Sequence, residues 1–391
     1  MAALSAHAAS LGSESSVSVS SEYASNPTLA PGGIAAEAAA VLATVPVTYA
    51  SEAESLEIKP SVRLAETHGV TQLLTNYQYL DAGWQLSSER SAYALGAEWH
   101  RDSTYYDVFE RSLLRGRTLP RLEEDVSASW RRALSELSGL QVASSYTQVA
   151  YSAESNQRLD NYNYTQGSLT FDHTFSETLS ADASIGYGRY ALRQPGEGND
   201  NRYVQASTKY QASEYWKLSA QIGYSRIASR SQVLLCCAIV RLPGGALGLR
   251  YVLTSQNTSG GLTSYGLNLN RQSEQMSIQI AAARSVQPTS FGAPLAIQTA
   301  GINVSHPLTE RWAVNASLQD SRQSDTLARS GSPASARFES AGAGATWQWT
   351  EHWTIGMQAA YSIAAVGNAT AQGRGASLLI NVTRQLGRVR L

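Results

Sequence analysis

The 391-residue chain has little of what several common protein classes need. Only two cysteines are present, which argues against a disulfide framework. No stretch approaches the ~18 consecutive apolar residues of a membrane-spanning helix, and the longest apolar run is VLLCCAIV at 233–240. Charged residues make up 16% and the net charge is −1, so nothing indicates a nucleic-acid partner. A transmembrane β-barrel remains compatible with these shortages, because its alternating strands score poorly on hydropathy.

The two cysteines, Cys236 and Cys237, are adjacent. Neighbouring residues of a strand face opposite sides. We therefore expect two small buried side chains, with a strained vicinal disulfide as the alternative.

Residues 1–53 are rich in Ala and Ser and contain no Lys or Arg. Their weak periodicity and the break PTLAPGG predict a low-complexity, disordered N-terminal segment before the folded part, 54–391. An exported protein is expected to begin with a basic n-region and an apolar h-region, and neither is visible. We expect either a misassigned start or a removed targeting segment, the alternative being a protein that is not exported.

A short Ser/Thr-Glu element recurs through the rest of the chain. It occurs seven times, with the glutamates at 89, 136, 177, 214, 274, 310 and 351. A Ser or Thr hydroxyl can hydrogen-bond to backbone two residues on, and Glu is depleted from strand interiors. Each copy therefore predicts a tight turn. The long interval between 214 and 274 contains Pro243-Gly244-Gly245, which predicts an eighth turn.

Each turn is flanked by runs in which apolar and polar side chains alternate. In 215–227, one face carries Trp216, Leu218, Ala220, Ile222 and Tyr224, and the other carries Lys217, Ser219, Gln221 and Gly223. Such a period of two is typical of a strand with one apolar and one polar face. Longer polar segments, such as 103–121 and 322–336, separate the opposite strand ends. The pattern predicts sixteen to eighteen strands, with eighteen preferred, including four over 215–228, 231–241, 246–255 and 261–271.

Short turns at one end and long loops at the other are typical of outer-membrane barrels. The sequence therefore predicts an all-β fold, a transmembrane antiparallel up-and-down barrel in the bacterial outer membrane. A propeller would need four short strands per period, whereas each period here holds two long ones. A soluble sandwich would need a core rich in Val, Ile, Leu and Phe. Here the apolar face consists mainly of Ala, Leu and Ile, and its Trp and Tyr are concentrated near strand ends.

Three tryptophans, Trp216, Trp312 and Trp353, each lie two residues after a turn glutamate. We expect them at one height, as a girdle at the periplasmic interface; the alternative is ordinary cross-strand packing. Near the other strand ends, Arg189, Arg226 and Arg284 share the apolar phase. There an arginine can bind lipopolysaccharide phosphate bidentately or simply reach water.

The polar phase predicts the wall of a lumen. Its candidates are mostly neutral amides: Gln141, Gln166, Asp172, Gln205, Lys209, Lys217, Gln221, Gln279, Asn315, Gln319, Gln358 and Asn381. Such a wall suits a polyhydroxylated solute better than selection of an ion, although any water-filled barrel needs polar walls. The six histidines share no ligand spacing, and no nucleophile or phosphate-binding motif occurs in a strand-to-helix context. We expect no catalytic residue, cofactor or metal.

The chain resembles the outer-membrane β-barrel proteins of bacterial exopolysaccharide and PEP-CTERM gene clusters, a β-barrel porin-2-like group. The resemblance covers roughly 55–385 and rests on SERSAYALGAEWHRDSTYYDVFERS at 88–112, on RSVQPTSFGAP at 284–294 and on turns such as LTERW. It implies a barrel that passes secreted polysaccharide through the outer membrane together with periplasmic export machinery. We therefore expect a conduit for exopolysaccharide or for another hydrophilic solute. The alternatives are a structural or surface-interaction barrel, whose long loops bind a partner, and a barrel enzyme acting on lipid or glycan.

Overall fold

The computed structural model describes residues 10–30, 32–69, 75–106, 118–152, 159–192, 198–241, 247–287, 295–325, 335–366 and 372–390. For 231–255, 325, 366 and 388–390 the description covers the backbone alone. No helix in this described part is long and apolar enough to cross a membrane.

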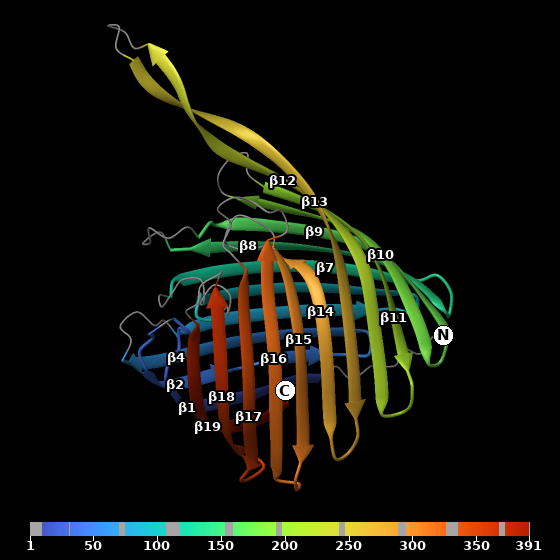
Figure 1. The fold of residues 1–391 in the computed structure, drawn as a ribbon. Coiled ribbons are helices and arrows are strands. Elements are labelled where there is room, and N and C mark those ends of the chain that lie inside the picture. Colours follow the sequence, from blue (N-terminus) through green and yellow to red (C-terminus); the bar gives the residue numbers. More distant parts are fainter. Residues whose placement is uncertain are drawn as a thin grey trace.

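Nineteen strands form a single closed sheet (Figure 1). Consecutive strands pair antiparallel, and β1 (Ser10–Ala24) pairs with β19 (Gly373–Arg390), which closes the barrel. The short strands β2 (Ala36–Thr44) and β3 (Val47–Ala50) both pair with β1 and with β4 (Glu54–His68), so they share one position. Nineteen strands therefore occupy eighteen positions. This confirms the predicted eighteen-stranded, antiparallel up-and-down barrel.

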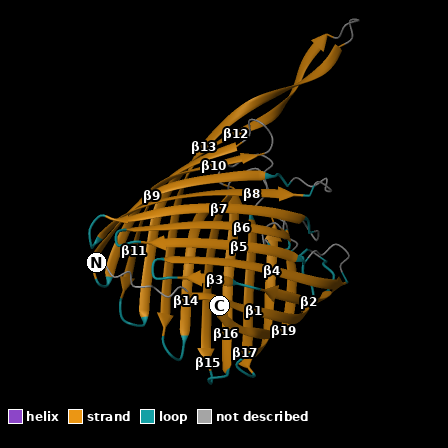
Figure 2. Cartoon of the chain, turned by 180° about the vertical axis from the view of Figure 1, so that it is seen from behind, coloured by secondary structure: helices purple, strands orange, loops and turns teal. Residues whose placement is uncertain are grey.

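The remaining strands follow one another around the barrel (Figure 2). They are β5 (Tyr77–Ser87), β6 (Ser91–Ser103), β7 (Pro120–Ala133), β8 (Ser138–Tyr151), β9 (Tyr162–Ser176), β10 (Leu179–Leu192), β11 (Gly198–Gln211), β12 (Trp216–Arg241), β13 (Leu247–Gln272), β14 (Ser277–Gln287), β15 (Leu295–Pro307), β16 (Trp312–Asp325), β17 (Ala336–Gln348) and β18 (Trp353–Val366).

The prediction of a disordered N-terminal segment over 1–53 is wrong for its described residues. They supply β1 to β3, and β1 pairs with β19 over twelve register positions, with one irregularity between Glu14 and Ser16. The physical reason lies in the alternation of small residues. Ser16, Ser18 and Ser20 face inward and Val17 and Val19 outward, so a Ser/Ala-rich segment still forms a two-faced strand.

The four strands predicted over 215–271 are two. β12 and β13 are 26 residues each, and their pairing continues from Trp216↔Arg271 to Arg241↔Leu247. This hairpin extends far beyond the barrel rim (Figure 1). A register shift between Leu235 and Ala238 brackets the two cysteines, whose side chains lie outside the described residues. The count of eighteen is right because these two missing strands are replaced by the two N-terminal positions.

The seven predicted Ser/Thr-Glu turns are confirmed. A Ser or Thr hydroxyl accepts a backbone N–H in each of them, for example Trp312 N–H to Thr309 Oγ1 at 3.1 Å and Trp353 N–H to Thr350 Oγ1 at 3.2 Å. The predicted eighth turn, at Pro243-Gly244-Gly245, lies outside the described residues. A short turn with the same chemistry lies at Ser51-Glu52, where Ser51 Oγ accepts the Glu54 N–H at 3.1 Å.

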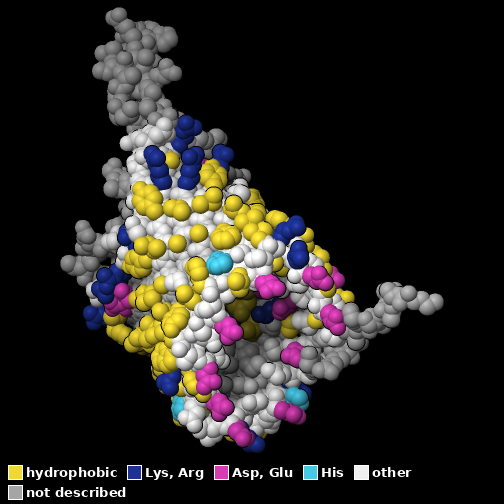
Figure 3. Space-filling view, turned by 90° about the vertical axis from the view of Figure 1, so that its right-hand side faces the viewer, with side chains coloured by type: hydrophobic (Ala, Val, Ile, Leu, Met, Phe, Trp, Pro, Cys, Tyr) yellow, Lys and Arg dark blue, Asp and Glu magenta, His cyan; other side chains and the backbone are white. Residues whose placement is uncertain are grey.

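Among the side chains that the structure describes, the strand register places every strongly exposed large apolar side chain of the barrel strands on one surface. Ile185, Ile222 and Leu318 are 57%, 63% and 57% exposed, and their cross-strand partners belong to the same apolar phase. Figure 3 shows hydrophobic side chains spread over the outer wall and carboxylates gathered around the hollow. The apolar phase therefore faces outward, and the polar phase faces the lumen.

Candidate functional site

All twelve lumen candidates lie on the inward phase, although on different parts of the wall. Gln166, Gln205 and Gln221 line one concavity of about 390 Å³. Lys209 and Lys217 line another near the short turns, of about 520 Å³. Gln141 lies beside the ion pair that Arg131 makes with Asp172 at 2.7 Å.

The other five candidates lie on the far wall, between β14 and β19. They are Gln279, Asn315, Gln319, Gln358 and Asn381. Two of these amides occupy space that a neighbouring glycine leaves free. A Cβ on Gly344 would lie 2.6 Å from Asn315 Oδ1, and one on Gly356 would lie 2.3 Å from Asn381 Oδ1. Asn315 and Asn381 therefore lie close against the wall.

Sequence reasoning missed a charged part of the wall on β4 to β7. We call Lys59, Asp81, Glu98, His100, Glu123 and Asp125 the charged wall. In the strand register, Asp81 lies directly opposite Lys59 on one side and Glu98 on the other. Glu98 lies opposite Asp125, and His100 lies opposite Glu123. Four carboxylates thus face the lumen beside one lysine and one histidine. The lumen is therefore strongly charged along β4 to β7, in contrast to the mostly neutral wall that the other inward residues form.

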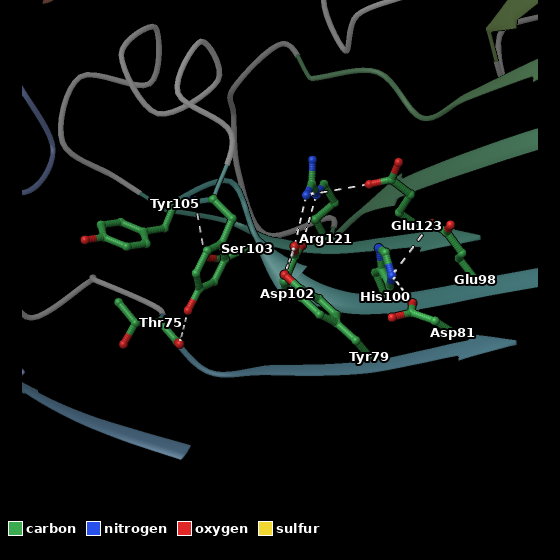
Figure 4. Close-up of polar contacts among 11 residues, drawn as sticks. Thr75, Tyr79, Asp81, Glu98, His100, Asp102, Ser103, Tyr105, Arg121 and Glu123 are labelled. Atoms are coloured by element: carbon green, nitrogen blue, oxygen red, sulfur yellow. Dashed lines mark hydrogen bonds and ion pairs between the residues drawn. The ribbon is translucent and has the colours of Figure 1, made fainter. Parts of the chain in front are cut away.

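Toward the long-loop end, the charged wall continues into a buried ion pair (Figure 4). Arg121 Nε and Nη2 donate to the two Asp102 carboxylate oxygens at 2.9 Å each, and Tyr79 Oη donates to Asp102 Oδ2 at 2.9 Å. The Asp102 side chain is only 2% exposed. A buried carboxylate needs such complete pairing, because an unpaired charge would be costly. This cluster therefore ties β5, β6 and β7 together near their long-loop ends.

Tyr106 lies beside this cluster, just beyond the end of β6. Its hydroxyl donates to the Thr75 carbonyl and accepts from Arg63 Nη1, which is 2.9 Å away. Burial raises the pKa of Tyr106 to about 12, although Arg63 lowers it in part. The hydroxyl therefore keeps its proton at neutral pH and remains a donor.

Asp81, Glu98 and His100 are the one group in the described part of the chain with metal-ligand chemistry. One potential ligand atom from each lies within 4.8 Å of the others. His100 Nε2 is 2.7 Å from Asp81 Oδ1, and its ring packs on Tyr79 with centroids 4.3 Å apart (Figure 4). Because the imidazole and carboxylate satisfy each other, this arrangement does not by itself require a metal.

The connection between β1 and β2 folds into the mouth of the barrel. Leu29 is buried against Phe338 and Ala364 on the inward phase of β17 and β18. Glycine makes this approach feasible, since a Cβ on Gly373 would lie 1.7 Å from the Leu29 carbonyl oxygen. Asn26 Nδ2 fixes the loop by donating to the Ala30 and Arg374 carbonyls at 2.8 and 3.1 Å. The loop therefore narrows the opening.

The three predicted girdle tryptophans lie on the outer face at the short-turn end. Trp312 stacks on Trp347, with ring centroids 5.5 Å apart and planes 9° apart. Trp216 lies under the Arg271 guanidinium at 5.5 Å, and Trp353 under that of Arg384 at 5.4 Å. Trp84 and Trp130 share this face and this end of the barrel. They stand three residues before a strand end, a spacing that sequence reasoning did not use.

The three predicted arginines lie on the outer face near the long-loop ends. Arg189 on β10 and Arg226 on β12 are separated by one strand, and that strand brings Arg202 directly opposite Arg226. Arg230, also on the outer face of β12, lies directly opposite Asn257 of β13 and donates to Asn257 Oδ1 at 3.4 Å. Arg284 is on β14, opposite Tyr265 and Gln298, and stands apart from the others. Sequence reasoning missed Arg202 and Arg230, although both have the same phase.

One Ser–His contact bears on the enzyme alternative. Ser138 Oγ and His173 Nδ1 are 2.8 Å apart on the outer face near the short turns. In the described part of the chain, no carboxylate contact is recorded for the other nitrogen of His173. The triad geometry that activates a serine is therefore incomplete there.

The geometry defines a closed eighteen-stranded antiparallel barrel with a polar lumen. No family model and no curated protein matches the chain. Among solved structures, it is similar to OccAB1 of Acinetobacter baumannii (TM-score 0.49, 8% identity, covering 97% of both chains). It is also similar to the outer membrane protein OpdK of Pseudomonas aeruginosa (0.48, 10%, covering 97% of this chain and 99% of that one). A third is the ferric-catecholate import receptor Fiu of E. coli K12 (0.47, 9%, 95% and 81%).

Proposed function

We propose that this chain is an integral barrel of the bacterial outer membrane and a conduit for a hydrophilic solute. The observation that supports this is the separation of faces around all eighteen positions: large exposed apolar side chains point outward, whereas amides, hydroxyls and carboxylates point inward. In water, such an outer surface would far exceed the few hundred Å² of apolar patch typical of a soluble monomer. In a bilayer, the same surface faces hydrocarbon, and the closed ladder leaves no unpaired edge.

The outer-face residues fit this placement. A girdle of Trp216, Trp312 and Trp353 would lie at the periplasmic interface, because Trp prefers the membrane–water boundary. At the opposite interface, Arg189 and Arg226 would meet lipopolysaccharide phosphate, and Arg284 would do so separately. The long-loop end, where the β12–β13 hairpin extends, would then face outside the cell.

The solute that we propose is a polysaccharide, and export of secreted exopolysaccharide is the specific role. The resemblance to barrels of exopolysaccharide gene clusters suggests this role. A large neutral part of the lumen wall supports it, since Gln and Ser side chains offer donors and acceptors for hydroxyl groups. Periplasmic export machinery would be the partner at the short-turn end.

Reconstitution of the purified full chain into planar bilayers tests the conduit. We expect stable single-channel steps, and liposomes carrying the protein should swell in isotonic sugar. A matched control is the chain refolded in detergent but not inserted. A folded, inserted barrel that conducts nothing, even with the Leu29 loop shortened, would contradict the conduit. Loss of extracellular polymer on deletion of the gene would separate exopolysaccharide export from general solute passage.

One observation favours a second function, that of a surface-interaction barrel. The β12–β13 hairpin runs well beyond the rim, a length that closure of the barrel does not require. Arg230 and Asn257 face each other across it, so a two-residue turn can join them and remove the outer part. A surface-interaction role predicts unchanged conductance and loss of polymer from the cell surface in this variant. Retention of surface polymer would count against that role.

A further inference from the structure

We propose that the inward face of β9 to β12 holds a binding subsite for neutral sugar residues. This proposal rests on the proposed conduit and names the part of the lumen wall that contacts the solute. The subsite is the tyrosine–glutamine patch: Tyr164, Gln166, Tyr203, Gln205 and Gln221. These side chains line one concavity of about 390 Å³. That volume is within the ~300–1,000 Å³ of small-molecule sites.

The two tyrosine rings lie along the wall because glycine leaves room for them. Tyr203 is directly opposite Gly186, and a Cβ on Gly186 would lie 2.2 Å from Tyr203 Cζ. A Cβ on Gly188 would lie 2.6 Å from Tyr164 Oη. Each ring therefore covers a glycine of β10 and is only partly exposed. One face of each ring remains toward the lumen, where the apolar face of a pyranose can stack on it.

Hydrogen bonds hold the two rings in this position. Tyr164 Oη donates to Gln166 Oε1 at 3.0 Å, and Gln166 Nε2 donates to Tyr203 Oη at 3.1 Å. The chain Tyr164–Gln166–Tyr203 thus spans β9 to β11. Because Tyr203 accepts in this chain, its own hydroxyl proton is left for a ligand.

The rest of the patch offers hydrogen bonds without charge. The side-chain amides of Gln205 and Gln221 have no hydrogen-bond partner among the described residues. The other lining residues are small or neutral: Ser168, Thr170, Ser184, Asn201, Ser225, Ser264, Ser285 and Val286. Among the described residues, no charged side chain lines the concavity. Flat aromatic faces with neutral donors and acceptors fit a sugar residue, whereas a carboxylated sugar would find no cation there.

Binding of two neutral probes, maltohexaose and cellohexaose, to the full chain in detergent micelles tests the subsite. We expect saturable binding of at least one probe by calorimetry, together with transient block of the current in planar bilayers. The double variant Tyr164→Ala/Tyr203→Ala should weaken binding about tenfold or more. Tyr203→Phe keeps the ring and should weaken it only a few-fold. Gly186→Ala keeps both tyrosines but displaces the ring, and should weaken binding as well.

Tyr187→Ala is the matched control, because Tyr187 is on the outer face of β10, next to Gly186. It should bind both probes like the wild type. The subsite is wrong if neither probe binds the wild type or if the double variant binds unchanged. A conducting wild type that binds neither probe overturns the subsite alone. A wild type that binds a probe but does not conduct overturns the conduit instead.

Discussion

Arg202 on β11 and Arg226 on β12 lie directly opposite each other on the outer face of the barrel. Like charges in this position destabilise a sheet by about 0.2–1 kcal/mol. No ion pair is recorded for either arginine within the described part of the chain. A pair of this kind is stabilised when an anion binds between the two guanidinium groups.

The first prediction follows from this pair. In neutral detergent, Arg226→Gln should raise the free energy of unfolding by about 0.2–1 kcal/mol, because the repulsion is lost. With lipopolysaccharide present, the same variant should be less stable than the wild type, because a charge-assisted hydrogen bond of about 1.5–3 kcal/mol is lost. Urea titrations in both media measure the difference. Arg101→Gln on the outer face of β6 is the control. If Arg226→Gln changes the free energy of unfolding in the same direction in both media, phosphate does not bind this arginine pair.

The second prediction concerns the charged wall. Four lumen carboxylates against Lys59 and His100 should attract cations and repel anions. The reversal potential across a KCl gradient should therefore show cation preference, and Asp81→Asn combined with Asp125→Asn should reduce it. Glu124→Gln changes a carboxylate on the outer face of the same strand and should leave the potential unchanged. Anion preference in the wild type would refute this reading of the lumen.

The third prediction concerns the ion pair of Asp102 and Arg121. Asp102→Ala removes the bidentate partner of the Arg121 guanidinium, which is 13% exposed and keeps the longer contact of 3.6 Å to Glu123. Loss of one member of a buried pair costs about 3–5 kcal/mol. Unfolding in urea should show this loss, whereas Asp320→Ala should cost less than about 1 kcal/mol, because its pairs with Arg322 and Arg337 are exposed. Equal losses in the two variants would show that burial does not set the difference.

The fourth prediction concerns the loop that carries Leu29. Replacing residues 27–33 by a Gly-Ser pair should widen the mouth and raise single-channel conductance, because the backbone that covers Gly373 is removed. Leu29→Ala keeps this backbone and should change conductance less. Electrical recordings of both variants under one salt condition decide the point. Equal conductance in the wild type and the shortened variant would place the narrowest part of the lumen elsewhere.

The inward and outward assignment of the site residues came from the sequence. A strand has a strict period of two, so one side chain of known phase fixes the face of every other residue in that strand. For this reason Gln141, Gln205 and Asn381 are on the polar wall although they lie on distant strands. Which of them share a concavity did not follow, since this depends on pairing between strands. The lumen position of Asp81 and Asp125, by contrast, follows from the phase of their strands alone.

The amino-acid sequence by itself determined the two-faced strands, the Ser/Thr-Glu turns and hence an antiparallel barrel, because these depend on neighbours two to four residues apart. The identity of the eighteen strands was decided by tertiary pairing, which recruits residues 10–50 to the wall and makes β12 and β13 one long hairpin. Only the tertiary structure decided how the barrel closes and which side chains of the wall contact one another. The pairing of Ser20 with Asn381 joins opposite ends of the chain, and no local pattern specifies such a partner. The same holds for Leu29 over Gly373 and Tyr203 over Gly186, since these contacts exist only when separate strands are brought into register.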